Sequence, residues 1–282
     1  KEGILFPLEG IVSGHFQLEG DEKNKIIDQL STGVPLEVTS KNLLPLGNKS
    51  YTVGDLITGY GVCESVIHYY NIYGGNLKNK RVIIQGWGNV AATAAYYLAQ
   101  QGAIIVGIID KNGGLINKNG FSFEKISHLL ENRSSNYLED SDIRPFDEIN
   151  NEIWKTGAEI FIPAAASRLV TNKNLEDMIE HNLEVISCGA NVPFADKEIF
   201  FGPIAKKADA QVSVIPDFIS NCGMARTFSY LMEKNIDIND LSIFEAVSET
   251  IFDALREAHE SNNSKQLIAK TSFELALKKL SL

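Results

Sequence analysis

A glycine-rich turn between an apolar run and an alanine-rich segment contains the residues whose types and spacing suggest chemistry most directly. The stretch Gly86-Trp87-Gly88-Asn89-Val90-Ala91 has the spacing G-x-G-x-x-A. Gly86 would allow a tight turn, Gly88 would let a pyrophosphate approach the backbone, and Ala91 would let a helix pack close to a sheet. The free N–H groups at the start of such a helix favour a bound diphosphate. The spacing therefore predicts a dinucleotide-binding turn.

A carboxylate at the end of the next apolar run supports this interpretation. Asp110 follows Ala91 by nineteen residues, which is the place for an acid that accepts hydrogen bonds from the adenosine ribose. A 2′-phosphate would meet a like charge there, so Asp110 favours NAD over NADP. Lys111 comes next and weakens that preference, because it adds a cation. The alternative is a glycine turn that binds no nucleotide, and the order of strand, turn, helix and acid disfavours it.

These residues need a strand–turn–helix–strand unit to position them. Arg81–Gln85 is a short β-branched run, which suits a buried parallel strand. Ala92–Gln101 is rich in alanine and predicts a helix that ends at Gly102. Ile104–Ile109 predicts the second strand. The unit is therefore a βαβ crossover with the glycine turn at its first strand end.

Strands and helices alternate along the rest of the chain. The further predicted strands are Glu159–Pro163, Glu184–Ser187 and Gln211–Ile215, and the further predicted helices are Tyr51–Tyr73, Ser122–Glu131, Asn174–His181, one within Ala195–Ala208, Ile219–Glu233, Asp240–Ser261 and Lys265–Leu280. We predict an α/β fold, a Rossmann-type doubly wound parallel sheet with extra C-terminal helices.

The same pattern suggests three regions. Residues 1–50 are interpreted as the remnant or tail of an upstream substrate or catalytic domain with its linker. Residues 51–235 form the NAD-binding Rossmann domain. Residues 236–282 form C-terminal helices that pack on the sheet edge or back on the first domain.

Two glycines complicate the helix predicted before the glycine turn. Thr52 is a suitable N-cap and Asp55 completes a capping-box variant. Gly59 and Gly61 lie inside the predicted helix, and each costs about 1 kcal/mol relative to alanine. Either close packing compensates for them, or the helix begins only after Gly61.

Small and amide residues follow the later strands, at the sheet edge where open α/β folds bind ligands. Pro163-Ala164-Ala165 would let a flat ligand lie against the backbone, and the amide of Asn191 could meet the nicotinamide side. Asn221 follows the fifth strand. Taken singly, these residues also suit helix initiation, a turn and a helix cap. Their placement after successive strands favours a shared site.

Composition excludes several classes of function. The 282 residues are 44% hydrophobic with a net charge of -10, which argues against nucleic-acid partners and anionic membrane surfaces. No apolar run approaches the length of a membrane span, and no signal peptide is recognisable. Cys63, Cys188 and Cys222 are far apart, which suggests a reducing cytoplasm. The five histidines have no metal-ligand spacing.

Several ordered motifs resemble the glutamate/leucine/phenylalanine/valine family of amino-acid dehydrogenases. The resemblance covers roughly Ser31 to the C-terminus and is closest to the glutamate branch. The matching stretches are Ser31–Pro35 (STGVP, similar to V-T-G-K-P), Thr58–Val62 (TGYGV, similar to T-G-R-G-V), Gln85–Val90 (QGWGNV, similar to Q-G-F-G-N-V), Pro163–Ala165, Gly189–Pro193, and Pro216–Tyr230 with its Asn221, Gly223 and Ser229.

The resemblance implies a role for each matching residue. The residues it assigns to the cofactor are Gly86, Gly88, Asn89 and Val90 at the pyrophosphate, Asp110 at the adenosine ribose, Ala164 and Ala165 at the adenine side, and Thr58 and Asn191 at the nicotinamide. Asn221 and Ser229 would lie beside the substrate. The implied reaction is oxidative deamination of an L-amino acid to a 2-oxo acid and ammonia, with hydride transfer to NAD. The family also implies a homo-oligomer for the full-length protein.

The departures from the family pattern leave the catalytic residues unknown. The family's proton-transfer lysine lies in a G-G-x-K-G loop, which is absent from the 282 residues. The family also uses an aspartate for proton transfer, but Asp21 is interpreted as a surface charge and not as that residue. Met224, Ala225 and Arg226 replace the usual Gly-Val-Thr, so Arg226 either binds a substrate carboxylate or lies on the helix surface.

Two other functions remain open on the sequence. The chain could be a complete, non-catalytic NAD-binding regulatory or sensing subunit. It could also be a different NAD enzyme that takes its acid or base from His15, His68 or His128.

Overall fold

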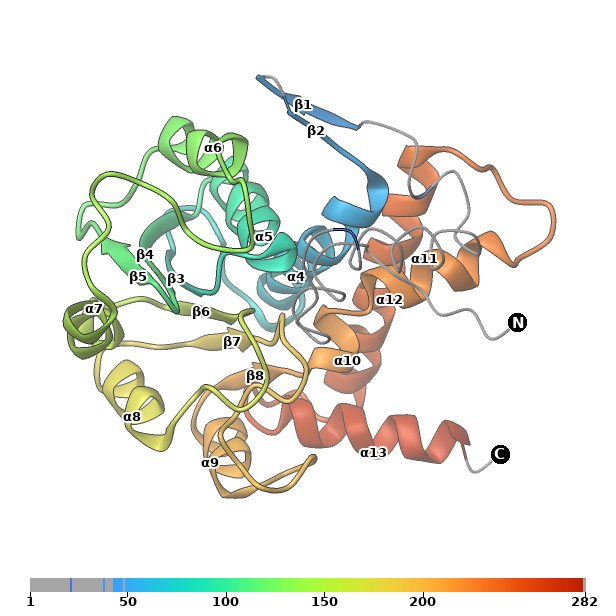
Figure 1. Ribbon diagram of the computed structural model, residues 1–282. Helices are drawn as coiled ribbons and strands as arrows, with labels where there is room; N and C mark the ends of the chain where they lie inside the picture. The colour runs from blue at the N-terminus through green and yellow to red at the C-terminus, as the bar shows by residue number, and fades with distance from the viewer. Residues whose placement is uncertain (1–20, 22–37, 39–42, 48, 281–282) are drawn as a thin grey trace.

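The computed structural model describes residue 21, residue 38 and residues 43–47 and 49–280, and its centre is a six-stranded sheet (Figure 1). The strands are β3 (Arg81–Gln85), β4 (Ile104–Asp110), β5 (Gly113–Ile116), β6 (Ile160–Pro163), β7 (Val185–Ser187) and β8 (Ser213–Ile215). Their order is β5-β4-β3-β6-β7-β8. All neighbouring pairs are parallel except β4 and β5. The predicted Rossmann-type α/β fold is confirmed.

The sheet is buried on both faces, and its sequence explains why. Alternate residues of a strand point to opposite faces. On β3, Val82 and Ile84 belong to one hydrophobic cluster while Ile83 belongs to the other. On β6, Phe161 lies on the same face as Ile83. Because both faces are apolar, these strands are continuous hydrophobic runs rather than alternating ones.

Helices cover both faces. The helices that precede the C-terminal part are α4 (Val53–Tyr73), α5 (Asn89–Gln100), α6 (Phe123–Glu131), α7 (Phe146–Glu152), the short 3₁₀ helix η1 (Ile153–Lys155), α8 (Asn172–Glu180), α9 (Pro203–Gln211), α10 (Asp217–Ser220) and α11 (Gly223–Leu231). Figure 1 shows α5 and α6 on one side of the sheet and α8 and α9 on the other. The chain is therefore wound to both sides of the sheet.

The helix α4 contains both glycines that the sequence left open. Thr52 caps it and forms the expected capping box with Asp55. A Cβ on Gly59 would lie 1.8 Å from Thr93 Oγ1 and 2.7 Å from Val90 O, on α5. A Cβ on Gly61 would lie 3.2 Å from Ser220 O. Close packing against α5 and α10 therefore compensates for the glycines, and the alternative start after Gly61 is wrong.

Some expected boundaries are wrong. The predicted helix Ile219–Glu233 is divided into α10 and α11 at Asn221. The composition of Lys111–Gly114 suggests a turn, but Gly113 and Gly114 begin β5, an antiparallel edge strand that the sequence pattern did not indicate. The polar and acidic composition of residues 132–151 suggests a surface loop with a short strand, but this stretch includes most of α7.

Two long helices follow α11. The helix α12 (Asp240–Ser261) packs along α4 and α11, with Ile243, Val247, Ile251 and Leu255 buried. The helix α13 (Ile268–Leu280) contacts α9 and the edge strand β8. Preceding α4, β1 (Leu44–Leu46) and β2 (Lys49–Tyr51) form a hairpin. Most of the predicted region 1–50, including the Ser31–Pro35 motif, lies outside the described residues.

Candidate dinucleotide site

The glycine turn lies where the strand order reverses, which is the usual ligand position in open α/β sheets. From β3 the chain proceeds to β4 on one side and later to β6 on the other. Gly86 has a φ of +102°, a conformation that glycine adopts without strain. A Cβ on Gly86 would lie 2.7 Å from Ala165 Cα. Only glycine therefore lets the turn approach the backbone after β6, where Ala164 and Ala165 stand.

The N-terminus of α5 is open in front of this turn. Gly88 is its N-cap, and no side chain caps the helix. Among the described residues, apart from the two chain neighbours of Gly88, the one heavy atom within 4 Å of a Cβ built on Gly88 is Asn136 Oδ1, at 3.9 Å. The uncapped N–H groups and the helix dipole thus face a space that an anion could enter.

Asn89 and Val90 connect the turn to other elements. The Asn89 amide donates to Asp55 Oδ1 over 3.1 Å, so α4 orients it. Val90 packs on the loop after β7, since a Cβ on Gly189 would be 3.2 Å from Val90 Cγ1 and 2.8 Å from Ala164 Cβ. The first turn of α5 and the ends of β6 and β7 therefore meet at one place.

Asp110 ends β4 and is 7% exposed. Its Oδ1 accepts the Asn112 N–H at 2.7 Å, and its Oδ2 accepts the Leu138 N–H. An ionised carboxylate has about four acceptor sites, so capacity for ribose hydroxyls remains. The structure adds a local role that the sequence did not indicate, because Asp110 also holds the backbone at Leu138.

The predicted nicotinamide and substrate residues are partly brought together. The Asn221 amide donates to Asn191 Oδ1 at 2.8 Å and to Gly189 O at 3.1 Å. A Cβ on Gly223 would lie 2.8 Å from Thr58 Cα, so α11 begins directly against Thr58. Thr58, Asn191 and Asn221 are thus connected through the end of α10, the start of α11 and the loop after β7.

Ser229 is not part of this contact group. It is exposed on α11, six residues after Gly223 and so about 9 Å further along the helix axis. Arg226, on the same helix, donates to Thr250 Oγ1 at 2.9 Å and pairs with Glu233 at 2.6 Å. These contacts place Arg226 on the α11–α12 surface, the second of its two expected positions.

The histidines offered as alternative acids or bases lie away from the turn or outside the described residues. His68 Nε2 is 2.9 Å from Ser248 Oγ, and its ring packs on Phe252. Burial lowers the pKa of His68, against the effect of nearby Glu64. His128 is exposed on α6 and contacts Asn132, and His15 lies outside the described residues. Asp21 is exposed.

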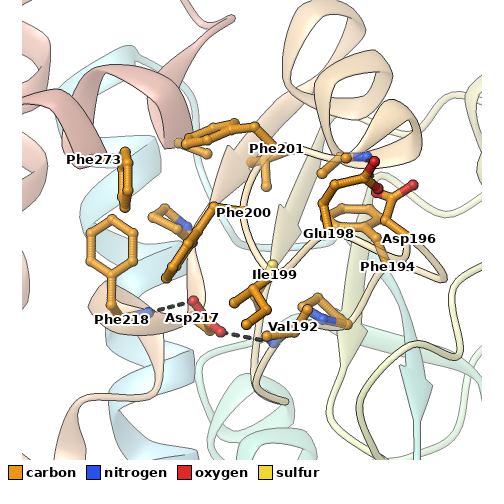
Figure 2. Close-up of a pocket in the computed structure, with 17 residues that line it drawn as sticks. Val192, Phe194, Asp196, Glu198, Ile199, Phe200, Phe201, Asp217, Phe218 and Phe273 are labelled. Atoms are coloured by element: carbon orange, nitrogen blue, oxygen red, sulfur yellow. Dashed lines mark hydrogen bonds between the residues drawn. The ribbon is translucent and has the colours of Figure 1, made fainter.

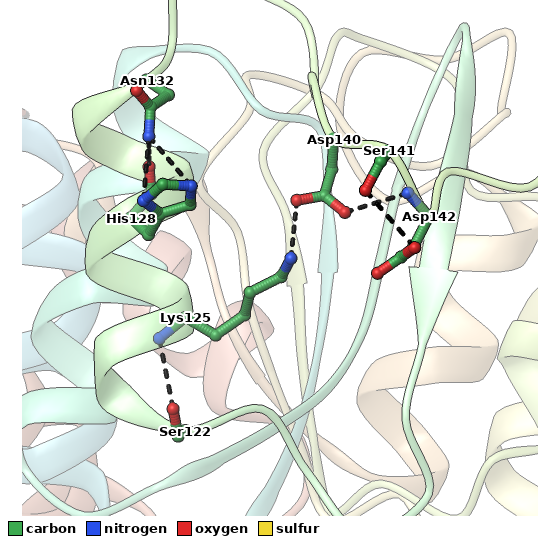
Figure 3. Close-up of polar contacts among 7 residues, drawn as sticks. All are labelled: Ser122, Lys125, His128, Asn132, Asp140, Ser141 and Asp142. Carbon is green, nitrogen blue, oxygen red and sulfur yellow. Dashed lines mark hydrogen bonds and ion pairs between the residues drawn. The ribbon is translucent and has the colours of Figure 1, made fainter.

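Sequence reasoning missed the stretch after α6. Arg133 donates from Nη2 to Asn89 Oδ1, Asn136 is near Gly88, and Leu138 contacts Asp110. The ion pair between Lys125 Nζ and Asp140 Oδ2, 2.6 Å long, fastens this stretch to α6 (Figure 3). The acid-rich run near Asp140 is the one signal of this stretch in the sequence. The contacts themselves leave no local pattern, because they join residues far apart in the chain.

A concave region lies next to Val192, on the side of α13. Figure 2 shows this apolar pocket, with the rings of Phe200, Phe218 and Phe273 gathered over it. Asp217 lines it, but its carboxylate accepts the Val192 N–H at 2.8 Å and the Phe218 N–H at 2.9 Å. The pocket contains none of the predicted site residues and offers no cation to a diphosphate. It is therefore separate from the dinucleotide site.

The described residues provide neither a metal site nor a membrane span. Across residues 43–47 and 49–280 with the two isolated positions, no cluster of three histidine, cysteine or acidic side chains is placed to hold a metal. No helix among those residues has the length and apolar character needed to cross a membrane.

Comparison with known proteins places this geometry among the amino-acid dehydrogenases. The family model for Glutamate/Leucine/Phenylalanine/Valine dehydrogenase matches residues 53–280. An NADP-specific glutamate dehydrogenase from Saccharolobus shibatae is 28% identical over 234 residues, covering 78% of this chain and 51% of that enzyme. The catabolic NAD-specific glutamate dehydrogenase RocG of Bacillus subtilis is 31% identical over 160 residues, 55% of this chain and 34% of that enzyme.

Solved structures share the fold. The hetero-hexameric glutamate dehydrogenase from Thermus thermophilus, in a Leu-bound form, superposes with a TM-score of 0.66 at 20% identity and covers 92% of this chain and 60% of that one. L-Tryptophan dehydrogenase from Nostoc punctiforme gives a TM-score of 0.55 at 17% identity, over 80% of this chain and 61% of that one. The chain spans about half the length, or less, of the two curated relatives named above.

Proposed function

The chain belongs to the Glutamate/Leucine/Phenylalanine/Valine dehydrogenase family, and on that premise we propose that it is the NAD-binding part of an amino-acid dehydrogenase most like glutamate dehydrogenase. The reaction of the whole protein would be oxidative deamination of an L-amino acid to a 2-oxo acid and ammonia. Bound NAD would accept the hydride. The region boundaries given above, a homo-oligomeric full-length protein and a cytoplasmic location are parts of this proposal.

One observation carries the proposal. The uncapped N-terminus of α5 opens beside Gly88 at the point where the strand order reverses, and Asp110 ends the neighbouring strand. Such a helix end attracts a diphosphate through its free N–H groups. The carboxylate one strand away is suited to the adenosine ribose. The two features together match the spacing of a dinucleotide rather than of a lone phosphate.

The choice of NAD over NADP rests on Asp110. Its carboxylate is nearly buried, and a 2′-phosphate beside it would bring like charges together. Lys111 does not offset this, because its Nζ lies over the ring of Tyr137, 4.1 Å from the centroid. The relatives include both NADP-specific and NAD-specific enzymes, so the cofactor must be determined for this chain itself.

The nicotinamide end would lie between Thr58 and Asn191. The amide of Asn191 is held by Asn221 at 2.8 Å, which leaves its own N–H groups free to meet a carboxamide. Asn221 is oriented by Gly189 O and would stand at the substrate side of the cleft. In this arrangement Asn221 acts on the cofactor through Asn191, while Ser229 would contact substrate only from further along α11.

The test is NADH binding by the 282-residue chain and its Gly88→Val variant. A Cβ on Gly88 would lie 3.9 Å from Asn136 Oδ1, its nearest described neighbour, so the valine side chain would enter the open space before α5, the position that the diphosphate needs. We expect NADH binding to be lost while the thermal unfolding temperature changes little. Ala210→Val, at an exposed position on α9, is the matched control and should bind as wild type. Unchanged NADH affinity in Gly88→Val would rule out this phosphate turn.

A further inference from the structure

One segment of the chain crosses the candidate dinucleotide site, and we call it the covering segment, residues 133–140. Its first residue, Arg133, contacts Asn89 in the first turn of α5. In its middle, Asn136 is the nearest side chain to the open space at Gly88. Near its end, the Leu138 N–H donates to Asp110. The covering segment thus meets the phosphate turn, the helix N-terminus and the ribose acid.

Arg133 places a guanidinium at the helix N-terminus, and not all of its N–H donors have an acceptor. Its Nη2 donates to Asn89 Oδ1. Its Nε is shielded from solvent and has no hydrogen-bond partner among the described residues. An arginine fork has five N–H donors, and a shielded donor without a partner costs about 1–3 kcal/mol. An acceptor that reaches this Nε would recover that cost.

The charges around the turn favour an anionic acceptor. Asp55 lies behind Asn89, with its Oδ1 accepting from the Asn89 amide at 3.1 Å, and Asp110 lies at the ribose end. A dinucleotide diphosphate adds two negative charges between these carboxylates. The helix dipole contributes only about half an elementary charge. Among the described residues, Arg133 is the cation whose hydrogen bond reaches this turn, and a guanidinium fork matches phosphate oxygens in geometry.

We propose that Arg133 binds the diphosphate of the dinucleotide, donating Nε–H and one Nη–H to its phosphate oxygens, in addition to the N–H groups of α5. This inference rests on the proposed function, because it assumes a dinucleotide at the glycine turn. It adds a residue outside every motif that identified the site. The Asn89 amide positions the guanidinium before the ligand arrives, so less side-chain freedom is lost on binding.

The structure also explains how a loop residue can be placed for this task. The Lys125–Asp140 pair fastens the end of the covering segment to α6 (Figure 3). The Asp140 carboxylate also accepts the Asp142 N–H at 3.1 Å, which fixes the turn that follows. With Leu138 held by Asp110, the segment has two attachments near its end and the C-terminus of α6 at its start. Arg133 therefore extends from an anchored backbone.

The experiment compares ligands with and without a diphosphate on three variants of the 282-residue chain. Arg133→Met keeps the length of the side chain and removes its charge, and Arg133→Lys keeps the charge but not the fork. Arg144→Met removes an exposed arginine paired with Glu152, outside the site, and is the matched control. The probes are NADH, ADP and adenosine, with affinities measured by calorimetry at two salt concentrations.

We expect Arg133→Met to weaken NADH and ADP binding by about 10-fold to 100-fold, the range for hydrogen bonds to a charged group. Adenosine affinity should not change. Arg133→Lys should give a smaller loss, and Arg144→Met none. The salt dependence of ADP binding should fall in Arg133→Met, because one ionic contact is gone.

Other outcomes overturn the inference and separate it from the proposed function. If Arg133→Met binds ADP as tightly as wild type while Gly88→Val does not bind it, the dinucleotide site stands and Arg133 only supports the loop. Equal losses for ADP and adenosine would also identify a structural role. If the wild-type chain binds neither NADH nor ADP, the proposed function and this inference both fail.

Discussion

At Asp140, burial and a neighbouring cation act on one carboxyl group in opposite directions. Burial would raise the pKa of Asp140, but the hydrogen bond and charge of Lys125 and the Asp142 N–H hold the pKa below its usual value. A carboxyl whose folded-state pKa is depressed stabilises the fold above its unfolded-state pKa, which is about 3.9 for aspartate. That contribution is lost as the pH falls through the folded-state pKa.

The Asp140→Asn variant tests this pair. We expect it to lower the free energy of unfolding by about 1 kcal/mol at pH 7, a modest value because Lys125 is partly exposed. The difference from wild type should shrink between pH 5 and pH 2, as measured by urea unfolding at a series of pH values. Asp142→Asn, at an exposed neighbouring position, should show no such convergence. Parallel stability profiles for Asp140→Asn and wild type would contradict the assignment.

Among single residues, the sequence predicted those site residues that lie close to one another along the chain. Gly86, Gly88 and Asp110 were identified because a turn, a helix start and a strand end follow each other within thirty residues. Arg133 was not, because its contact with Asn89 joins positions 44 residues apart and no motif marks the stretch after α6. The second role of Asp110, holding Leu138, was missed for the same reason.

At the scale of elements, α4 and α5 cross so closely that only a hydrogen fits between them at Gly59. A Cβ there would lie 1.8 Å from Thr93 Oγ1 and 2.7 Å from backbone atoms of α5. Because α5 provides the predicted phosphate-binding N-terminus, this crossing sets the position of the site as well as the packing of the core. The glycine that weakens α4 as an isolated helix is therefore needed by the assembled pair.

Replacement of Gly59 by alanine should be destabilising despite the better helix propensity of alanine. Propensity would contribute about 1 kcal/mol in favour, and overpacking against the backbone costs about 1–3 kcal/mol or more. We expect a net loss of about 1–2 kcal/mol in urea unfolding. Gly61→Ala is the control, because its nearest contacts are at 3.2 Å or beyond, and its net effect should be smaller. A Gly59→Ala variant as stable as wild type would show that α5 can shift.

The parallel strands were predictable because each is a short apolar run buried on both faces, and burial of this kind leaves a continuous hydrophobic pattern. The edge strand β5 was not, because Gly113 and Gly114 have low strand propensity and are held in the strand by backbone pairing, with β4 and at Gly114 also with Arg144. The break at Asn221 between α10 and α11 was missed because Asn221 bonds to Gly189 and Asn191, which are thirty residues earlier. Tertiary contacts decide both cases.

At the scale of the whole molecule, the C-terminal helix closes the edge of the sheet, and Asp209 connects the two. Asp209 lies in the last turn of α9 and accepts the Ala269 and Lys270 N–H groups at 2.9 Å each, so it serves the first turn of α13 as a cap provided from another element. Its backbone carbonyl accepts the Leu267 N–H at 2.7 Å. The position of α13 against β8 therefore depends on a buried side chain sixty residues away.

Burial raises the pKa of Asp209, opposed by the two N–H groups and by the charge of Lys270. A raised folded-state pKa means that this group's contribution falls as the pH rises above the unfolded-state value of about 3.9. We expect Asp209→Ala to lower the free energy of unfolding by about 2 kcal/mol at pH 7, because two backbone N–H groups lose their acceptor. Removal of the buried charge offsets part of that loss. Asp209→Asn should lower the free energy of unfolding by less. Its stability should not decline above pH 4 as that of the wild type does, because the amide does not titrate.

Hydrogen exchange distinguishes this role from general destabilisation. In Asp209→Ala the amides of α13 should exchange much faster, while those of β3, at the centre of the sheet, should change only as far as global stability falls. Asp253→Ala removes an exposed partner of Arg256 on α12 and should leave α13 protected. Uniform acceleration across β3 and α13 in Asp209→Ala would mean that the helix and the sheet unfold as one unit. In that case the C-terminal helix is part of the cooperative core rather than a cover attached to its edge.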